Sequence, residues 1–232
     1  VATTDYYDDY DKDKTSHYAG ESHYEGGYDH RPIFTATSQD FTVQVKDHIT
    51  FPCDGENLGN TILMFRHLLP RGGHRLLYVG DTMLKPRLYS LKKLGNSFIL
   101  SNVSKDHAGK YECRIETQRV EQLLHTLNVQ YPATVKRISK EEQRVAKGST
   151  VTLTCEAEGN PKAAISWSKL QGHLPSGAKS EEGFSLILDK VDRHAEGTYI
   201  CTASNGVGPP SSTRMSVQVE YAPEIITDQV SK

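Results

Sequence analysis

The two cysteine neighbourhoods of this chain each occur twice along its 232 residues. The stretch VKDHITFPC (45–53) matches VAKGSTVTLTC (145–155), and NVSKDHAGKYEC (102–113) matches KVDRHAEGTYIC (190–201). A repeat on this scale predicts two successive domains of one fold. The even number of widely spaced cysteines suggests two disulfides and an oxidising compartment, and the lack of a CxxC pair argues against a zinc knuckle.

Aromatic residues recur at fixed distances from these cysteines. Phe65 and Trp167 follow the first cysteine of each unit by twelve residues. Tyr111 and Tyr199 precede the second cysteine by two. In these features the sequence resembles the immunoglobulin superfamily, in which a ring packs against an inter-sheet disulfide and a tyrosine closes a corner of the sandwich.

The resemblance implies a fold and a disulfide pattern. The fold is all-β, with two tandem immunoglobulin-like β-sandwiches in extended array, the first variable-type and the second intermediate-type. The implied disulfides are Cys53–Cys113 and Cys155–Cys201. Each would contribute roughly 4 kcal/mol in the chain-entropy model. The longer interval between the first two cysteines leaves room for the additional strands of a variable-type domain.

The domain boundaries follow from the repeat. We expect an acidic, Tyr- and His-rich disordered arm over residues 1–31, domain 1 over 32–131, domain 2 over 132–220 and a stub over 221–232. The stub begins with YAPEI, similar to YPATV at the start of domain 2, which indicates the start of a third immunoglobulin domain; a natural C-terminus is the alternative. The chain begins at Val1 without a hydrophobic leader, which predicts a form with its signal peptide removed, or a shortened fragment.

Three groups of phrases narrow the resemblance: RGGHRLLYVGD, then YECRIET with LLHTLNVQYP, then CEAEGNPKAAISWSK with YICTASNGVG. They are similar to the insect lachesin, klingon and amalgam group, which is akin to the neurotrimin-type neuronal adhesion proteins. The resemblance covers residues 38–228. It implies a secreted or cell-surface glycoprotein, in some relatives lipid-anchored, that mediates neuronal or epithelial adhesion. Its partner would be itself, as a homodimer, or another immunoglobulin-superfamily protein.

Two departures from the family pattern predict local differences in packing. Phe65 stands where tryptophan is usual, so the first core lacks an indole N–H. His107 occupies a position that is usually Asp. We therefore expect the neighbouring Asp106 to pair with a basic residue of the adjacent strand, for which Arg87 is the candidate.

The open face of domain 1, built from strands C, C′, F and G in the family's lettering, is the predicted binding surface. Because Phe65, Tyr111 and Cys113 point inward, alternation turns their neighbours outward. An apolar centre with a charged rim is typical of a protein-binding surface, although scattered apolar residues are normal on any protein. The predicted face comprises Met64, Arg66, Leu68, Leu76, Tyr78, Arg114, Glu116, Leu124 and Thr126.

Two further surface features carry predictions. Asn102-Val103-Ser104 is the one N-x-S/T sequon, and it falls between two expected strands, so Asn102 is a predicted glycosylation site. A cluster of basic residues in domain 1 would suit a glycosaminoglycan or the acidic arm, although solvated loops are the simpler interpretation. The cluster comprises Arg66, Arg71, Arg75, Lys85, Arg87, Lys92 and Lys93.

The remaining patterns limit the class of function. The sequence contains no P-loop, GxSxG or HExxH motif, so we expect no enzyme, no catalytic residue, no cofactor and no metal. No run of about 18 apolar residues is present, so membrane attachment would need a C-terminal anchor outside this sequence. A net charge of −2 disfavours nucleic acid. Two competing functions stay open: a soluble protein that captures a secreted ligand, and the distal part of a signalling receptor.

The acidic arm contains DYYDDYDKDK (5–14). An EF-hand reading fails because Lys14 takes the position of the required Gly and Gly20 that of the bidentate Glu. The repeated SHY (16–18 and 22–24) leaves weak copper or zinc capture as an alternative. High charge without aliphatic periodicity predicts disorder. Tyrosines flanked by Asp in a secreted chain are candidates for sulfation, and here they are Tyr6, Tyr7 and Tyr10.

Overall fold

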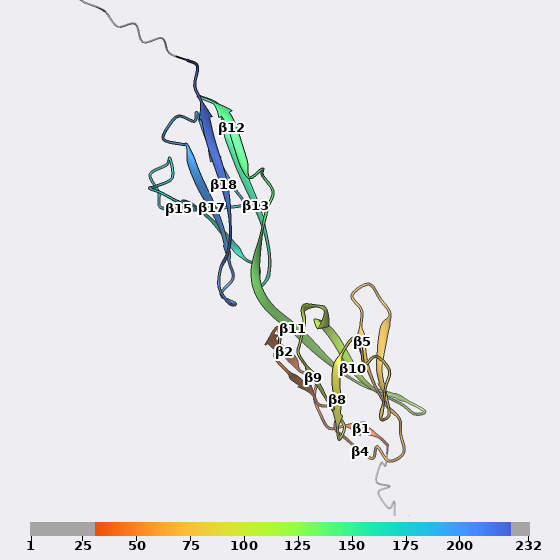
Figure 1. The fold of residues 1–232 in the computed structure, drawn as a ribbon. Helices are drawn as coiled ribbons and strands as arrows, with labels where there is room; N and C mark the ends of the chain where they lie inside the picture. Colours follow the sequence, from red (N-terminus) through yellow and green to blue (C-terminus); the bar gives the residue numbers. More distant parts are fainter. Residues whose placement is uncertain (1–30, 224–232) are drawn as a thin grey trace, which may run out of the picture. The chain divides into compact units, whose positions relative to one another are not determined.

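The computed structural model describes residues 31–223 of the chain (Figure 1). The tyrosines predicted to be sulfated lie outside this range. The described residues form β-strands and one short 3-10 helix, arranged as two sandwiches that each enclose their own hydrophobic core. The predicted all-β, immunoglobulin-like fold is confirmed. Within this range, no helix is long and apolar enough to cross a membrane.

The first sandwich has two sheets and a short ribbon. One sheet has the order β7-β6-β5-β10-β11, with β2 parallel to β11, and the other has the order β3-β9-β8. The ribbon pairs β1 with β4. The bounds are β1 Ile33–Phe34, β2 Asp40–Gln44, β3 Ile49–Phe51, β4 Gly55–Glu56, β5 Leu63–Leu68, β6 His74–Val79, β7 Thr82–Met83, β8 Ser90–Leu94, β9 Ser97–Ser101, helix η1 Lys105–His107, β10 Gly109–Glu116 and β11 Val120–Arg137.

The second sandwich also has two sheets. One has the order β12-β18-β17-β14-β15, and the other pairs β16 with β13 and β13 with the end of β11. The bounds are β12 Glu142–Ala146, β13 Val151–Asn160, β14 Ala164–Lys169, β15 Ser180–Glu182, β16 Ser185–Leu188, β17 Gly197–Ser204 and β18 Ser211–Glu220. Strand β11 therefore serves both sandwiches, and the predicted boundary between residues 131 and 132 falls inside it, so that boundary stays a prediction.

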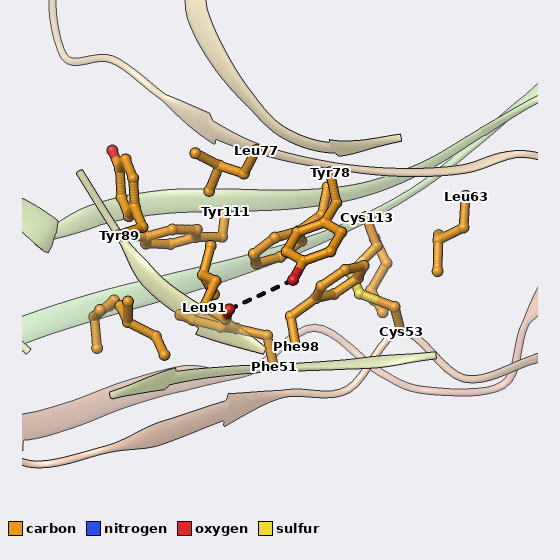
Figure 2. Close-up of a cluster of buried hydrophobic side chains, with 14 of the residues drawn as sticks. Phe51, Cys53, Leu63, Leu77, Tyr78, Tyr89, Leu91, Phe98, Tyr111 and Cys113 are labelled. Carbon is orange, nitrogen blue, oxygen red and sulfur yellow. Dashed lines mark hydrogen bonds between the residues drawn. A yellow bond between two sulfur atoms is a disulfide. The ribbon is translucent and has the colours of Figure 1, made fainter. Parts of the chain in front are cut away.

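Stacked aromatic rings fill the first core (Figure 2). Phe65 lies nearly parallel to Phe98, with ring centroids 4.3 Å apart. Phe51 stacks on Tyr111 with centroids 4.5 Å apart. All four rings are fully buried. Aromatic pairs contribute about 0.5–1.5 kcal/mol beyond their buried area, so this stack gives rigidity to a core whose central ring is smaller than the usual indole.

Disulfides join the two sheets in each sandwich. The bonds are Cys53–Cys113 and Cys155–Cys201, which confirms the predicted pairing. In the second core Trp167 is buried and its indole N–H donates to the Gly183 carbonyl oxygen at 3.0 Å. A buried indole nitrogen that lacked such an acceptor would cost about 1–3 kcal/mol, so the Gly183 carbonyl helps to fix the position of the ring.

A tyrosine hydroxyl closes the same corner in both sandwiches. Tyr111 Oη donates to the His107 carbonyl oxygen at 2.7 Å, and Tyr199 Oη donates to the Ala195 carbonyl oxygen at 2.7 Å. Both rings are fully buried. Burial also raises the pKa of Tyr199 to about 12, so this hydroxyl keeps its proton at physiological pH.

Buried histidines, and not an ion pair, hold the corner of the first sandwich around η1. Within residues 31–223 no salt bridge joins Asp106 to Arg87, so the prediction of that pair was wrong. His67 Nδ1 instead lies 2.7 Å from Tyr89 Oη. The His107 ring stacks on Tyr89 with centroids 5.0 Å apart. Aromatic and imidazole contacts therefore take the place of the expected charge pair.

Candidate functional site: the outer face of β5, β6, β10 and β11

The outer surface of β6, β5, β10 and β11 in the first sandwich is here called the β5–β10 face. On β5, the half-buried Met64, Arg66 and Leu68 alternate with fully buried neighbours that point into the core. Burial alternates in the same way along the domain-1 part of β11. The face comprises Met64, Arg66 and Leu68 of β5, Leu76 of β6, Lys110, Glu112, Arg114 and Glu116 of β10, and Gln122, Leu124 and Thr126 of β11.

Tyr78 does not belong to this face, which corrects the prediction that it points outward. Its side chain is only 6% exposed and forms part of the core. The cause is an irregularity in β6: Phe65 pairs with Tyr78, but the next residue, Arg66, pairs with Leu76. The extra residue between them, Leu77, shifts the alternation, so that Leu76 stays outward while Tyr78 faces inward.

A network of charged side chains crosses the centre of the face. Arg66 Nε donates to Glu112 Oε2, and Arg114 Nη1 lies 3.8 Å from Glu112 Oε1. Arg114 Nε donates to Glu116 Oε1 at 2.8 Å. The Glu112 side chain is 5% exposed, against 20% for Arg66 and 19% for Arg114. A carboxylate buried to this degree is stable only when it is paired, so the two arginines hold it and it holds them.

Apolar side chains surround this network. Strand register places Leu124 on one side of Glu112 and Arg66 on the other, with Leu76 beyond Arg66. Met64 lies directly across from Arg114, and Leu68 across from Lys110. The arrangement differs from the expected apolar centre with a charged rim, because here the charged network is central and the apolar residues surround it. Methionine and arginine are nevertheless enriched at protein–protein interfaces, so the face keeps residue types that suit a binding surface.

The sequence prediction missed Glu112, although its signal was present. Alternation from Tyr111 and Cys113 already turns Glu112 outward, between two strands that carry arginine. The prediction named Arg114 and Glu116 from the same strand and passed over the residue between Tyr111 and Cys113. Its low exposure depends on Arg66 from another strand, and the sequence alone does not show this contact.

The predicted basic cluster does not form one patch of free cations. Lys93 Nζ donates to Asp81 at 2.6 Å, and Arg66 is held by Glu112. Arg75 Nη1 lies 3.5 Å from Tyr89 Oη, and this contact raises the Arg75 pKa. The exposed members are Arg71, Arg75, Lys85, Arg87 and Lys92. The cluster is thus divided between the β5–β10 face, where Arg66 lies, the β5–β6 turn and β6, where Arg71 and Arg75 lie, and the segment from β7 to β8, which carries the three lysines and Arg87.

Two histidines lie on the inner side of the strands that build the face. His67 of β5 is 2% exposed, and His125 of β11 is fully buried. His125 Nε2 donates to the Pro52 carbonyl oxygen at 2.9 Å. Burial lowers the pKa of both imidazoles, so they are neutral at physiological pH. The core side of the strands that form the face therefore contains two uncharged histidines.

Other predicted sites lie away from the face. Asn102 is exposed in the loop between β9 and η1, where its backbone has a φ of 51°, and its glycosylation stays a prediction. Cys53, Cys113 and His125 bring their ligand atoms within 4.8 Å of one another. The two cysteines are bonded to each other, so they offer no thiolate to a metal ion.

Comparison with known proteins gives one matching family model and several curated relatives. A family model described as an immunoglobulin domain matches residues 134–205. Amalgam of Drosophila melanogaster is 26% identical over 208 residues, which cover 84% of this chain and 62% of amalgam. Neuronal growth regulator 1 of Gallus gallus is 34% identical over 130 residues, 56% of this chain and 36% of that protein. Lachesin of Drosophila melanogaster is 29% identical over 157 residues, 64% of this chain and 44% of lachesin. The chain spans less than two thirds of each of these relatives.

Solved structures with a similar fold contain tandem immunoglobulin domains. The structure of Dpr11 IG1 bound to DIP-gamma has a TM-score of 0.70 and 25% identity, and the match covers 82% of this chain and 98% of that one. The structure of Dpr2 Ig1-Ig2 in complex with DIP-Theta has a TM-score of 0.63 and 28% identity, and the match covers 81% of this chain and 66% of that one. In both, one immunoglobulin-domain protein binds another.

Proposed function

We propose that this chain, an immunoglobulin-domain protein whose relatives include amalgam, lachesin and neuronal growth regulator 1, is an extracellular recognition and adhesion protein that binds another immunoglobulin-domain protein through the β5–β10 face. The observation that carries the proposal is the charged network fixed at the centre of an apolar sheet face. The relatives are adhesion proteins, and DIP-gamma and DIP-Theta are solved in complexes with immunoglobulin-domain partners.

The chemistry of the face suits this role. An interface of standard size buries about 800 Å² on each partner, within reach of one sheet face of a sandwich. Met64, Leu68, Leu76 and Leu124 supply apolar area, while Arg66 and Arg114 supply donors whose orientation is already set. Groups held in their bound geometry lose little side-chain entropy on association, so they add affinity and select the partner.

Binding by an aspartate variant tests the proposal. The full chain and its Met64→Asp variant are screened by surface plasmon resonance against a panel of extracellular immunoglobulin-domain proteins. Met64 is half-buried at the centre of the face. A carboxylate introduced there would lose its water in the interface and would compete with Glu112 and Glu116 for Arg114, which lies directly across from it. We therefore expect at least about 100-fold weaker binding.

The matched control is Ile187→Asp in the second sandwich, where the side chain is 63% exposed. This variant should bind as tightly as the unmodified chain. Equal loss in both variants, or no loss in Met64→Asp, would refute the assignment of the face. If a ligand that is not an immunoglobulin-domain protein bound the unmodified chain and Met64→Asp equally well, the result would favour the capture of a secreted ligand instead.

A further inference from the structure

Strand β16 is an outer strand of its sheet in the second sandwich, and within residues 31–223 no strand pairs with its free edge. We propose that a second copy of this chain pairs with this edge, so that the two β16 strands run antiparallel about a two-fold axis beside Leu186. The pairing would join the β16-β13-β11 sheets of the two copies into one continuous sheet. The proposal goes beyond the proposed function, because it uses the second sandwich and leaves the β5–β10 face uncovered.

The backbone groups of Ser185 and Ile187 point toward the free edge. Cys155 N–H donates to the Phe184 carbonyl oxygen at 3.0 Å, which fixes the hydrogen-bonding positions of the ladder between β13 and β16. Such positions alternate in an antiparallel ladder, so the two leucines of β16 bond to β13. The N–H and C=O groups of Ser185 and Ile187 therefore face away from β13. In the part of the chain that the structure describes, no hydrogen bond reaches these four groups.

Strand β16 lacks the features that commonly protect a sheet edge. Natural sheets block free edges with charged residues, proline or bulges. The sequence of β16 is SLIL, and its register with β13 is regular, so it has none of these. By contrast, the outer strand β8 contains Lys92 and Lys93, and the outer strand β15 contains Glu181 and Glu182. The edge of β16 is therefore suited to receive another strand through main-chain hydrogen bonds.

Hydrogen bonding selects the register of the two strands. A two-fold axis beside Leu186 and perpendicular to the sheet places Ser185 across from Ile187 of the second copy, and Ile187 across from Ser185 of the second copy. Each of these pairs exchanges two N–H···O=C bonds, so every outward group of both strands is used. An axis beside Ser185 or Ile187 would pair only one of these two residues within β16. The edge is therefore satisfied completely when Leu186 lies at the centre.

The side chains of β16 are compatible with a second copy of the same strand. None of them is charged, so no like charges of this strand meet when two identical edges come together. Ile187 is 63% exposed on the outer surface of the sheet, and the pairing places the two Ile187 side chains diagonally across the new ladder, within reach of each other. Leu186 and Leu188 stay in the core of their own sandwich. One short edge is a small interface, so we expect weak and transient association.

Sedimentation equilibrium of the full chain and two variants at Ile187 tests the pairing, at concentrations up to about 1 mM because the interface is small. Ile187→Pro removes an N–H that faces the free edge, and a sheet tolerates proline at such an edge position. We expect its self-association to be at least about 10-fold weaker. Ile187→Thr is the matched control: it keeps the N–H and a branched side chain, so its self-association should change by less than about threefold.

Cysteine crosslinking tests the register, and it decides the question if circular dichroism shows that Ile187→Pro is unfolded. Ser185→Cys and Ile187→Cys are prepared separately, mixed 1:1 and mildly oxidised. Directly paired residues have Cα atoms about 5.5 Å apart, within the range of a disulfide. Like positions lie on a diagonal at about 7–8 Å, beyond that range. We expect a crosslinked dimer in the mixture and much less from either variant alone, and none when Lys136→Cys replaces Ile187→Cys.

Several outcomes decide the proposal. A chain that stays monomeric, or crosslinks that form equally in the mixture and in the single variants, overturns it. A dimer that is lost in Met64→Asp and kept in Ile187→Pro also overturns it, because self-association then uses the β5–β10 face. A monomeric chain whose Ile187→Pro variant loses a partner found in the binding screen overturns it too, and makes β16 the edge for a strand of that partner. Failure of the β16 pairing with partner binding still lost in Met64→Asp leaves the proposed function standing.

Discussion

Acidification should destabilise the first sandwich selectively, because two of its core side chains are neutral histidines. His67 is 2% exposed and His125 is fully buried. Burial is the largest cause that lowers the pKa of each, outweighing the Ala108 carbonyl near His67 and the Pro52 carbonyl bound by His125. In the unfolded chain both imidazoles return to an ordinary pKa of about 6.5. Below that pH these two imidazoles bind protons in the unfolded state but stay neutral in the folded state. The free energy of unfolding therefore decreases as the pH falls.

The size of the effect follows from proton linkage. Each histidine that stays neutral in the folded state costs at most about 1.4 kcal/mol per pH unit below its unfolded pKa. Between about pH 6.5 and pH 5 this amounts to about 2 kcal/mol for each histidine, or about 4 kcal/mol for the pair. A loss of about 2 kcal/mol, half of this upper limit for the pair, would lower the melting temperature of a domain of this size by about 8–16 °C.

The second sandwich is the internal control. Its histidines, His173 and His194, are both exposed. The His194 backbone N–H holds the pKa of Asp192 below its usual value, but a carboxylate of this kind loses its stabilising effect only below about pH 4, outside the range of the experiment. Trp167, the single tryptophan of the chain, lies in this sandwich, so its fluorescence follows the unfolding of this sandwich alone.

Scanning calorimetry between about pH 7.5 and pH 5, with Trp167 fluorescence to assign the transitions, measures the difference. The transition not followed by Trp167 should shift down by several degrees more than the other. Replacing His125 by Phe should remove about half of the pH dependence, at the cost of the hydrogen bond to Pro52. Equal shifts of both transitions, or an unchanged slope in His125→Phe, would show that buried neutral histidines do not control the acid response.

Three further predictions concern the corner and the loop of the first sandwich. Tyr111→Phe leaves the His107 carbonyl without its donor and should cost about 1–3 kcal/mol in urea unfolding; a loss below about 0.5 kcal/mol would mean that water replaces the hydroxyl. Gly109 has a φ of 144°, and a Cβ there would lie 2.5 Å from His67 Nε2. Gly109→Ala should therefore destabilise the chain by about 2 kcal/mol or more in the same urea unfolding experiment. An unchanged free energy of unfolding would contradict the packing of this corner. Asn102 should carry a glycan when the chain is made in a secretory cell, seen as a mass decrease after glycosidase treatment that Asn102→Gln abolishes.

The fold was predictable because its determinants are local and repeated. The spacing of Phe65 and Tyr111 from their cysteines recurs at Trp167 and Tyr199, and resemblance then supplied the disulfide pairing. Period-2 alternation is also a local property, so it placed most of the β5–β10 face in the right orientation.

Three details depend on contacts between strands, and the sequence did not reveal them. The irregularity at Leu77 reverses the orientation of Tyr78, because one extra residue shifts the alternation of everything after it. Glu112 is paired with Arg66 from β5 as well as with Arg114 from its own strand, and the contact with β5 does not follow from the sequence. In place of the expected pair of Asp106 and Arg87, the corner contains contacts of Tyr89 with His67 and His107, which come from distant segments. Such contacts need the register of paired strands, which composition and spacing do not supply.

The most direct test of the account is a crystal structure of this chain bound to the partner that the binding screen selects. The account predicts that Met64, Leu76 and Leu124 lose most of their accessible area, with Arg66 bonded to an acidic or carbonyl oxygen of the partner and Glu112 still bound to Arg66. A partner seated on β3, β9 and β8, or on the second sandwich, with the β5–β10 face left open to solvent, would contradict it.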